Sequence, residues 1–221
     1  MYVEGNDVRG GMIRTTYRPE AVDEALAQLN SALKLVPQDI SVHKGRLHVL
    51  EVAGRYDEMA EALDESCSAY KETRGADEWI RYTFELYEAK HYRASIKLLE
   101  VLDKHYPNSY EVLGNFDAMH SLLKEDDQAI AYLHRAVAFA PDDPIDTWDL
   151  GREYDYAGKI ELADQWYQKA LTLDTDATHR RSSECIYAEF VEKKLHDLKR
   201  ACELQRKSCE AKAQTACAGG N

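Results

Sequence analysis

The chain has 221 residues, of which 44% are hydrophobic and 31% charged, and its formal net charge is −12. It contains no stretch of about 18 apolar residues, which excludes a membrane-spanning helix. An acidic surface repels phosphate backbones, which argues against nucleic acid as the main ligand. Residues 1–16 lack an apolar core of signal-peptide length, so a cytoplasmic location is the default expectation, unless the chain is a segment of a longer protein.

The chain begins with an irregular segment, and a periodic pattern follows it. Residues 1–19 contain Gly5, Asn6, Gly10 and Gly11 and do not share the later pattern. From residue 20, three columns recur every 34 or 35 residues. A first column of mostly small residues comprises Ala25, Met59, Ala94, Ala129 and Ala163. A second, seven residues further on, comprises Ala32, Ser66, Val101, Ala136 and Ala170. Between them lie Leu29, Leu63, Leu98, Leu133 and Tyr167.

These columns predict stacked helices. Positions seven apart lie on one face of an α-helix, where small side chains let a neighbouring helix approach closely and a leucine or tyrosine between them fills the gap. Gly54 and Gly158 follow the predicted first helices, where a residue with positive φ is expected. Pro37, Pro107 and Pro141 close second helices.

The repeating unit resembles the tetratricopeptide repeat, which is two antiparallel helices in about 34 residues. The copy at 144–177 matches best. It carries Trp148, Leu150, Gly151, Tyr154, Gly158, Ala163, Tyr167 and Ala170. The resemblance implies an all-α, right-handed superhelical solenoid of antiparallel helix pairs. Its array spans 20–177, with a half-unit at 20–39 and units at 40–73, 75–108, 110–143 and 144–177. Residues 178–217 are expected to form C-terminal capping helices, and 218–221 a frayed tail.

No catalytic or metal-binding constellation is evident in the sequence. The eight histidines form no HExxH or HxH motif, and neither a phosphate-binding glycine loop nor a GxSxG elbow occurs. We therefore expect no enzyme activity, no metal and no cofactor. The five cysteines include no CxxC pair and are odd in number, which predicts free cysteines used in packing rather than a disulfide framework.

The resemblance implies that the first helices line a concave surface on which peptides bind. The side chains expected to face it, and hence the candidate peptide-binding residues, are Trp79, Tyr87, Asn115, Trp148, Arg152 and Tyr156. The aromatic rings would serve as apolar anchors, and Arg152 with Asn115 would hydrogen-bond a peptide carboxylate or backbone. The alternative is that Trp79 and Trp148 pack between repeats. The lysine, asparagine and arginine clamp of chaperone-binding relatives is incomplete, since only Lys44, Asn115 and Arg152 match it.

Two functions remain open on the sequence alone. The first is a non-catalytic scaffold or adaptor for a protein or peptide of basic or amphipathic character, because residues 1–177 carry a net charge of −15. The alternative explanation of this negative charge is that it serves solubility. The second is a structural self-association or assembly module, giving a homo-oligomer, in which the basic C-terminal helix of one copy docks on the acidic body of another. That reading uses the +3 charge of residues 178–221.

Overall fold

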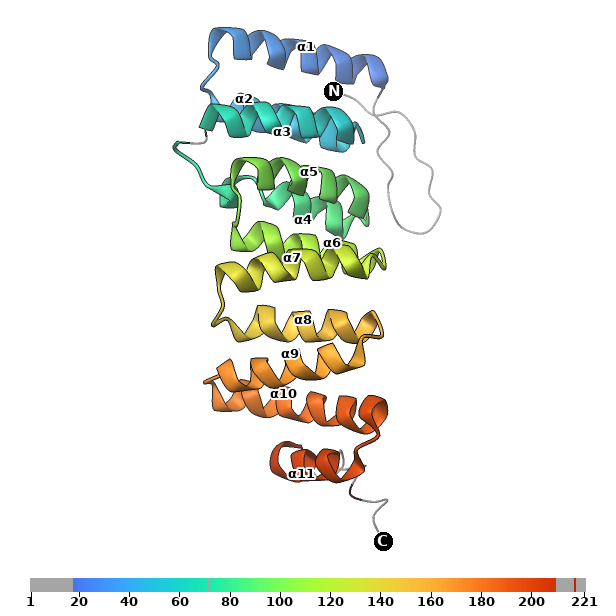
Figure 1. The fold of residues 1–221 in the computed structure, drawn as a ribbon. Helices are drawn as coiled ribbons and strands as arrows, with labels where there is room; N and C mark the ends of the chain where they lie inside the picture. Colours follow the sequence, from blue (N-terminus) through green and yellow to red (C-terminus); the bar gives the residue numbers. More distant parts are fainter. Residues whose placement is uncertain (1–17, 71, 210–216, 218–221) are drawn as a thin grey trace. The chain divides into compact units, whose positions relative to one another are not determined.

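The computed structural model describes residues 18–70, 72–209 and 217, and all regular structure within them is helical. Residues 1–17 of the expected irregular segment 1–19 and the tail at 218–221 lie outside these residues, whereas Pro19 already begins the first helix. The chain divides into two compact units, Met1–Ser109 and Tyr110–Asn221, and the division falls between two predicted repeats. Each unit is a stack of antiparallel helix pairs, which confirms the all-α repeat fold (Figure 1).

The described part of unit 1 contains one helix, α1, followed by two helix pairs. Its described helices are α1 (Pro19–Leu35), α2 (Ile40–Val52), α3 (Tyr56–Tyr70), α4 (Arg81–Glu88) and α5 (Tyr92–His105). The first helix of the unit at 75–108 is shorter than the repeat pattern predicts. A 3₁₀ turn at Ala76–Glu78 precedes α4, and the amides of Trp79 and Ile80 both bond to the carbonyl of Ala76, at 2.9 Å each.

Unit 2 contains two complete helix pairs and a C-terminal pair. Its described α-helices are α6 (Tyr110–Leu122), α7 (Asp126–Phe139), α8 (Pro144–Tyr156), α9 (Ile160–Leu173), α10 (Ala177–Phe190) and α11 (Leu198–Ser208). A π-helical turn, Val191–Leu195, ends α10, and His196 then reverses the chain with a φ of 55°. The side chain of Asp197 accepts a hydrogen bond from the amide of Arg200 at 3.0 Å and so starts α11.

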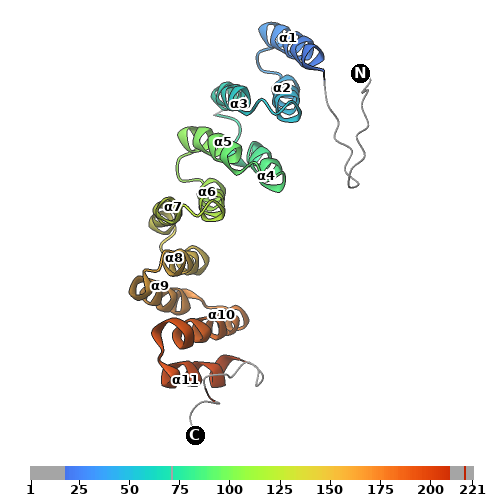
Figure 2. The same ribbon diagram turned by 90° about the vertical axis from the view of Figure 1, so that its right-hand side faces the viewer.

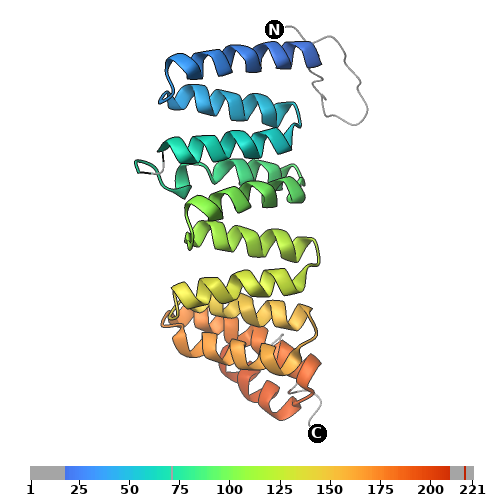
Figure 3. The same cartoon turned by 45° about the horizontal axis from the view of Figure 1, so that its top comes forward.

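The repeat columns form the core of each unit. Met59 and Leu63 on α3 are fully buried, as are Leu98 on α5 and Ala163 on α9. The small residues allow close contact between neighbouring helices, and one such contact is visible at Gly151, where an added Cβ would lie 2.7 Å from the ring of Tyr167. The residues that recur along the sequence are therefore those that pack the helices together, as the sequence predicts. Figure 3 shows the resulting stack of helices in each unit from a second direction.

The turn inside each helix pair uses the left-handed conformation. Gly54 and Gly158 have φ values of 69° and 70°, which confirms the expectation for both glycines. Lys90 and Lys124 take the equivalent place in two other pairs, with φ values of 62° and 61°, and His196 in the C-terminal pair has a φ of 55°. Three of the five described turns therefore place a residue with a Cβ in a conformation that favours glycine.

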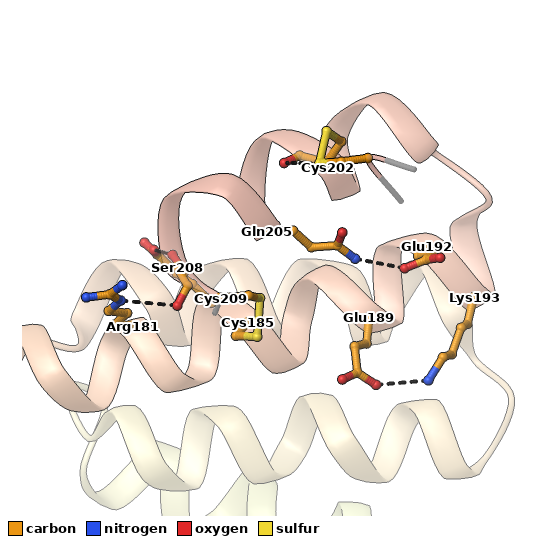
Figure 4. Close-up of a disulfide and its surroundings, with 11 residues drawn as sticks. Arg181, Cys185, Glu189, Glu192, Lys193, Cys202, Gln205, Ser208 and Cys209 are labelled. Atoms are coloured by element: carbon orange, nitrogen blue, oxygen red, sulfur yellow. Dashed lines mark hydrogen bonds and ion pairs between the residues drawn. A yellow bond between two sulfur atoms is a disulfide. The ribbon is translucent and has the colours of Figure 1, made fainter. Parts of the chain in front are cut away.

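The cysteine expectation is wrong for four of the five residues. Disulfides join Cys185 to Cys209 and Cys202 to Cys217, with Cα–Cα distances of 5.1 and 4.8 Å. Only Cys67 is free, and it is buried in the core of unit 1. Figure 4 shows that the first disulfide ties α10 to the end of α11. The same two helices are linked by a hydrogen bond of 3.2 Å from Arg181 Nε to the carbonyl of Ser208.

Across the described residues, none of the helices combines the length and the apolar character needed to cross a lipid bilayer.

Candidate functional site

The first and second helices of the repeats lie on different sides of unit 2. In Figure 2, α6, α8 and α10 lie on one side, and α7 and α9 on the other. We call the side formed by α6 and α8 the first-helix face. It carries four exposed apolar side chains, namely Tyr110, Leu122, Ile145 and Tyr156, which are between 45% and 58% exposed.

Helix α8 carries a row of carboxylates along the first-helix face. Its N-terminus is fixed by Asp143, whose side chain accepts hydrogen bonds from the amides of Ile145 at 2.7 Å and Asp146 at 3.1 Å. Asp146, Asp149 and Glu153 then follow at intervals of three and four residues, which places them on one side of the helix. Asp117 on α6 joins the same group, because its Oδ2 lies 3.6 Å from Nη2 of Arg152 on α8.

One arginine lies among these carboxylates. Nη1 of Arg152 lies 2.6 Å from Oδ1 of Asp149, its Nη2 lies 3.6 Å from Oδ2 of Asp117, and its Nε lies 3.5 Å from Oε1 of Glu153. Only the contact with Asp149 is as short as a normal hydrogen bond. Asp117, Asp146, Asp149, Glu153 and Arg152 are hereafter called the acidic cluster. With every carboxyl ionised, its net charge would be −3.

Three of the carboxylates are both buried and incompletely bonded. Glu153 is 0% exposed, and neither of its Oε atoms has a hydrogen-bond partner. Asp117 and Asp146 are each only 5% exposed. Oδ1 of Asp117 and Oδ2 of Asp146 have no hydrogen-bond partner. Burial, reinforced by Glu153, raises the pKa of Asp117 to about 7, and burial with Asp143 and Asp149 raises the pKa of Asp146 to about 6. A buried carboxylate without a partner costs stability, so this arrangement is suited to a positively charged group that is not part of the chain.

Three of the sequence-predicted residues lie close to the acidic cluster. Arg152 belongs to it and is already engaged by carboxylates, so it offers little to a peptide carboxylate. Tyr156 lies one turn further along α8 and is 58% exposed, with Nζ of Lys124 5.7 Å from its ring centre. Asn115 on α6 donates from Nδ2 to the carbonyl of Glu111 at 2.7 Å.

Trp148 is half-buried between α8 and α9. Its ring centre is 4.6 Å from that of Tyr167, and it packs against the apolar core of unit 2. Most of the surface of Trp148 is therefore used in packing between helices, which is the alternative that the sequence left open. The remainder stays open to solvent on the helix that carries the acidic cluster.

The two candidates in unit 1 are placed differently from one another. Trp79 is 0% exposed and lies against Tyr70, with ring centres 6.0 Å apart, so it offers no surface to a ligand in this structure. The tryptophan belongs to the core because the 3₁₀ turn before α4 directs it inward. Tyr87 is partly exposed and contacts the rings of Phe84 and Tyr92 at 5.9 and 6.0 Å.

The carboxylates of the acidic cluster are the residues that sequence reasoning overlooked. Asp117 does break the repeat pattern, since it stands where unit 144–177 has the small residue Gly151. That departure was the available signal, because a carboxylate in a position made for close packing must be buried or displace its neighbours. Among the described residues, no three histidine, cysteine, aspartate or glutamate side chains are grouped in a way that could hold a metal ion.

Sequence comparison finds no relative for the chain, because neither a family model nor a curated protein matches it. Solved structures do match. The crystal structure of YrrB, described as a TPR protein with an unusual peptide-binding site, aligns with 86% of this chain and 97% of its own length, with a TM-score of 0.52 at 14% identity. The chain has a tetratricopeptide-repeat fold.

Other structures share this tetratricopeptide-repeat fold over most of the chain. MamA from Desulfovibrio magneticus RS-1 covers 82% of this chain and 96% of its own, with a TM-score of 0.55 and 19% identity. PilW, a type IV pilus biogenesis factor, covers 90% and 91%, with a TM-score of 0.52 and 18% identity. At these identities the likeness establishes the fold, and function has to be argued from the residues of the site.

Proposed function

We propose that this tetratricopeptide-repeat chain is a non-catalytic scaffold that binds a protein or peptide on its first-helix face. The supporting observation is the character of that face in unit 2. Exposed aromatic and apolar side chains flank a group of buried polar atoms that lack partners. Apolar anchors around a few directed polar groups are typical of peptide recognition. YrrB, which has the same fold, is described as having a peptide-binding site.

The proposed contact residues are those of the sequence set that reach solvent. On the first-helix face of unit 2 they are Asn115, Trp148, Arg152 and Tyr156. Tyr87 belongs to unit 1 and is not part of this face. Trp79 is left out because it is fully buried. Tyr156 is the strongest of them, since its ring is more than half exposed and lies next to the acidic cluster.

Selection from a displayed random-peptide library tests this function. The purified wild-type protein should enrich a family of peptides, and Tyr156→Ala should lose them. Phe139→Ala is the matched control, because Phe139 is an exposed ring of similar size, 60% against 58%, on the second helix α7. Equal recovery with the wild type and Tyr156→Ala, or loss in the Phe139→Ala control, would place the binding surface elsewhere.

The C-terminal helices fit an end cap better than a docking arm. Lys194 pairs with Asp155 at 3.2 Å, Arg200 with Asp164 at 3.0 Å, and Lys207 with Glu184 at 2.8 Å, all within unit 2. Basic side chains engaged in this way are not available to another copy. Solenoids need a terminal element that covers the last repeat, and α11 suits that role.

The disulfides indicate the kind of cellular compartment in which the protein functions. Disulfides persist in oxidising compartments and are rare in the cytosol. The pairs Cys185–Cys209 and Cys202–Cys217 therefore favour an oxidising compartment over the cytoplasmic location that the sequence suggests by default. Alkylation of thiols during extraction from the native source, followed by mass measurement, tests this. Protein alkylated at all five cysteines would overturn it.

A further inference from the structure

The acidic cluster has more negative charge than its own arginine can neutralise. Three carboxyl groups, those of Asp117, Asp149 and Glu153, lie within 3.6 Å of Arg152, and its one short contact is with Asp149. Oδ1 of Asp117 and Oδ2 of Asp146 remain without partners although both side chains are about 95% buried. Buried polar atoms in folded proteins almost always have a partner, so an unpaired pair of carboxylate oxygens on a candidate binding face calls for one from outside.

The missing partner is better described as an organic cation than as a metal ion. Among the residues that the structure describes, no group of three potential ligands exists that could hold a metal. Lysine and arginine side chains need only one or two carboxylates, and they carry their own apolar stems. Tyr110, at 45% exposed, lies near enough to Asp146 and Asp149 for these carboxylates to raise its pKa in addition to the effect of burial. Its ring offers the stem an apolar wall and the cation a π-face.

We propose that the acidic cluster of unit 2 receives a lysine or arginine side chain of the bound peptide, held by Asp117 and Asp146. This specifies the ligand class of the first-helix face and therefore rests on the function proposed above. Arg152 borders the site. Its side chain is 37% exposed, and its Nη2 lies 3.6 Å from Oδ2 of Asp117, which leaves Oδ1 of Asp117 for the incoming cation.

Protonation should control this binding. Asp117 is surrounded by Asp146, Asp149, Arg152 and Glu153 and titrates at about 7, whereas Asp146 titrates at about 6. A bound cation favours the ionised carboxylates, so it lowers both pKa values. Affinity should therefore be highest above pH 7 and should fall as the pH is lowered from 8 to 6, because the cation must then displace protons.

The test uses a small probe, so that it does not depend on a peptide being found. N-acetyl-arginine amide is titrated into the whole protein while the side-chain carboxyl carbons are followed by NMR. Saturable shifts of the Asp117 and Asp146 carboxyl signals are expected at pH 8. N-acetyl-citrulline amide, which has the same shape without the charge, should produce none. Magnesium ion is the third probe.

Two double variants separate the site from general charge. Asp117→Asn/Asp146→Asn should weaken binding of the arginine probe about tenfold or more, because the charge partners are lost. Asp127→Asn/Glu161→Gln removes the same two charges from exposed positions on α7 and α9 and should bind as the wild type does. Circular dichroism of both variants shows whether the fold is kept. If the first variant does not fold, the citrulline comparison on the wild type decides alone.

The outcomes distinguish the two proposals. Saturation with the arginine probe supports the cation site, and if the library also yields no peptides, only the scaffold function fails. Library peptides with no preference for a basic residue, together with no saturation by the arginine probe, overturn the cation site and leave the scaffold intact. Equal shifts with citrulline, or saturation by magnesium alone, also overturn it.

Discussion

At the scale of single residues, the turn inside each helix pair shows how backbone conformation and side chain compete. Gly158 has a φ of 70°, and an added Cβ there would meet no atom within 4 Å. Any cost of a side chain at Gly158 is therefore conformational. Gly114, in the middle of α6, also has open space around an added Cβ, but its backbone is helical.

These two glycines predict opposite responses to the same change. Gly158→Ala should lower the free energy of unfolding by about 1 kcal/mol, because alanine is disfavoured at positive φ. Gly114→Ala should raise it by roughly 0.5–1 kcal/mol, because alanine is the better helix former. Urea denaturation of the two variants measures both. A loss of stability at both positions would mean that contacts, rather than backbone preference, dominate there.

Asp117 predicts a stability change that depends on pH. Burial raises its pKa from 3.8 to about 7, so its favourable contribution to folding is present below pH 3.8 and is lost as the pH rises through 7. Asp117→Asn should therefore stabilise the protein at pH 8, by roughly 2 kcal/mol, and the gain should shrink toward pH 5. Urea unfolding at both pH values checks this. A pH-independent effect would show that Asp117 is not a destabilising buried acid, and Asp127→Asn, at an exposed position, is the control.

A residue that lowers stability and leaves an oxygen unpaired is most simply explained by binding. Proteins tolerate local strain and unpaired charge mainly at functional sites. The stability gain expected for Asp117→Asn and the loss of cation binding expected for Asp117→Asn/Asp146→Asn are therefore two consequences of one arrangement.

At the scale of helices, α10 and α11 depend on covalent links as well as packing. Cys185–Cys209 spans 24 residues and Cys202–Cys217 spans 15. A half-buried hydrogen bond of 2.8 Å from Gln205 Nε2 to Glu192 Oε2 links α11 to the π-helical turn that ends α10 (Figure 4).

The crosslink leads to a prediction about stability and thiol count. Cys185→Ala/Cys209→Ala should lower the free energy of unfolding by about 3 kcal/mol, as expected for a closed loop of this length. The wild type, denatured without reductant and treated with an alkylating agent, should gain one group, at Cys67, and after reduction five. Mass spectrometry counts them. Five groups without reduction would contradict the disulfides.

The comparison of sequence and structure is clearest at this scale. Helix pairs are predictable because each small-residue column depends only on spacing along one chain segment. The cysteine pairs are not, because they form only after the π-helical turn and His196 reverse the chain and bring α11 against α10. The spacing of Cys202 and Cys209, seven apart, predicts a shared helix face, but α11 ends at Ser208, and each cysteine pairs with a partner elsewhere in the chain.

The candidate site was predictable to a similar extent. The repeat pattern identified the helices that bear it, and so Arg152 and Tyr156 could be named. Burial could not be read from spacing, which is why Trp79 was included and Asp117 and Asp146 were not. Whether a side chain of a first helix is exposed depends on the helix beside it. For Trp79, the 3₁₀ turn before α4 directs the side chain into the core.

At the scale of the whole molecule, the net charge of −12 is divided between an acidic body and a basic end. Self-association would need the basic end to be unoccupied. Arg200 and Lys207 instead pair with Asp164 and Glu184 of the same unit, whereas Lys199 and Arg206 on the same helix are exposed. Substituting Arg200 and Lys207 therefore tests pairing within unit 2, whereas substituting Lys199 and Arg206 tests contact with another copy.

Light scattering with two charge-matched variants decides between these roles. The wild type should keep a monomer mass at every concentration and salt level. Arg200→Ala/Lys207→Ala should lower the free energy of unfolding by about 1–2 kcal/mol without changing that mass, because Glu184 and Asp164 lose their partners. Lys199→Ala/Arg206→Ala should change neither quantity. A mass that rises with concentration, falls with salt and returns to the monomer value in Lys199→Ala/Arg206→Ala would instead establish assembly through the basic helix, since salt screens attraction between exposed charges.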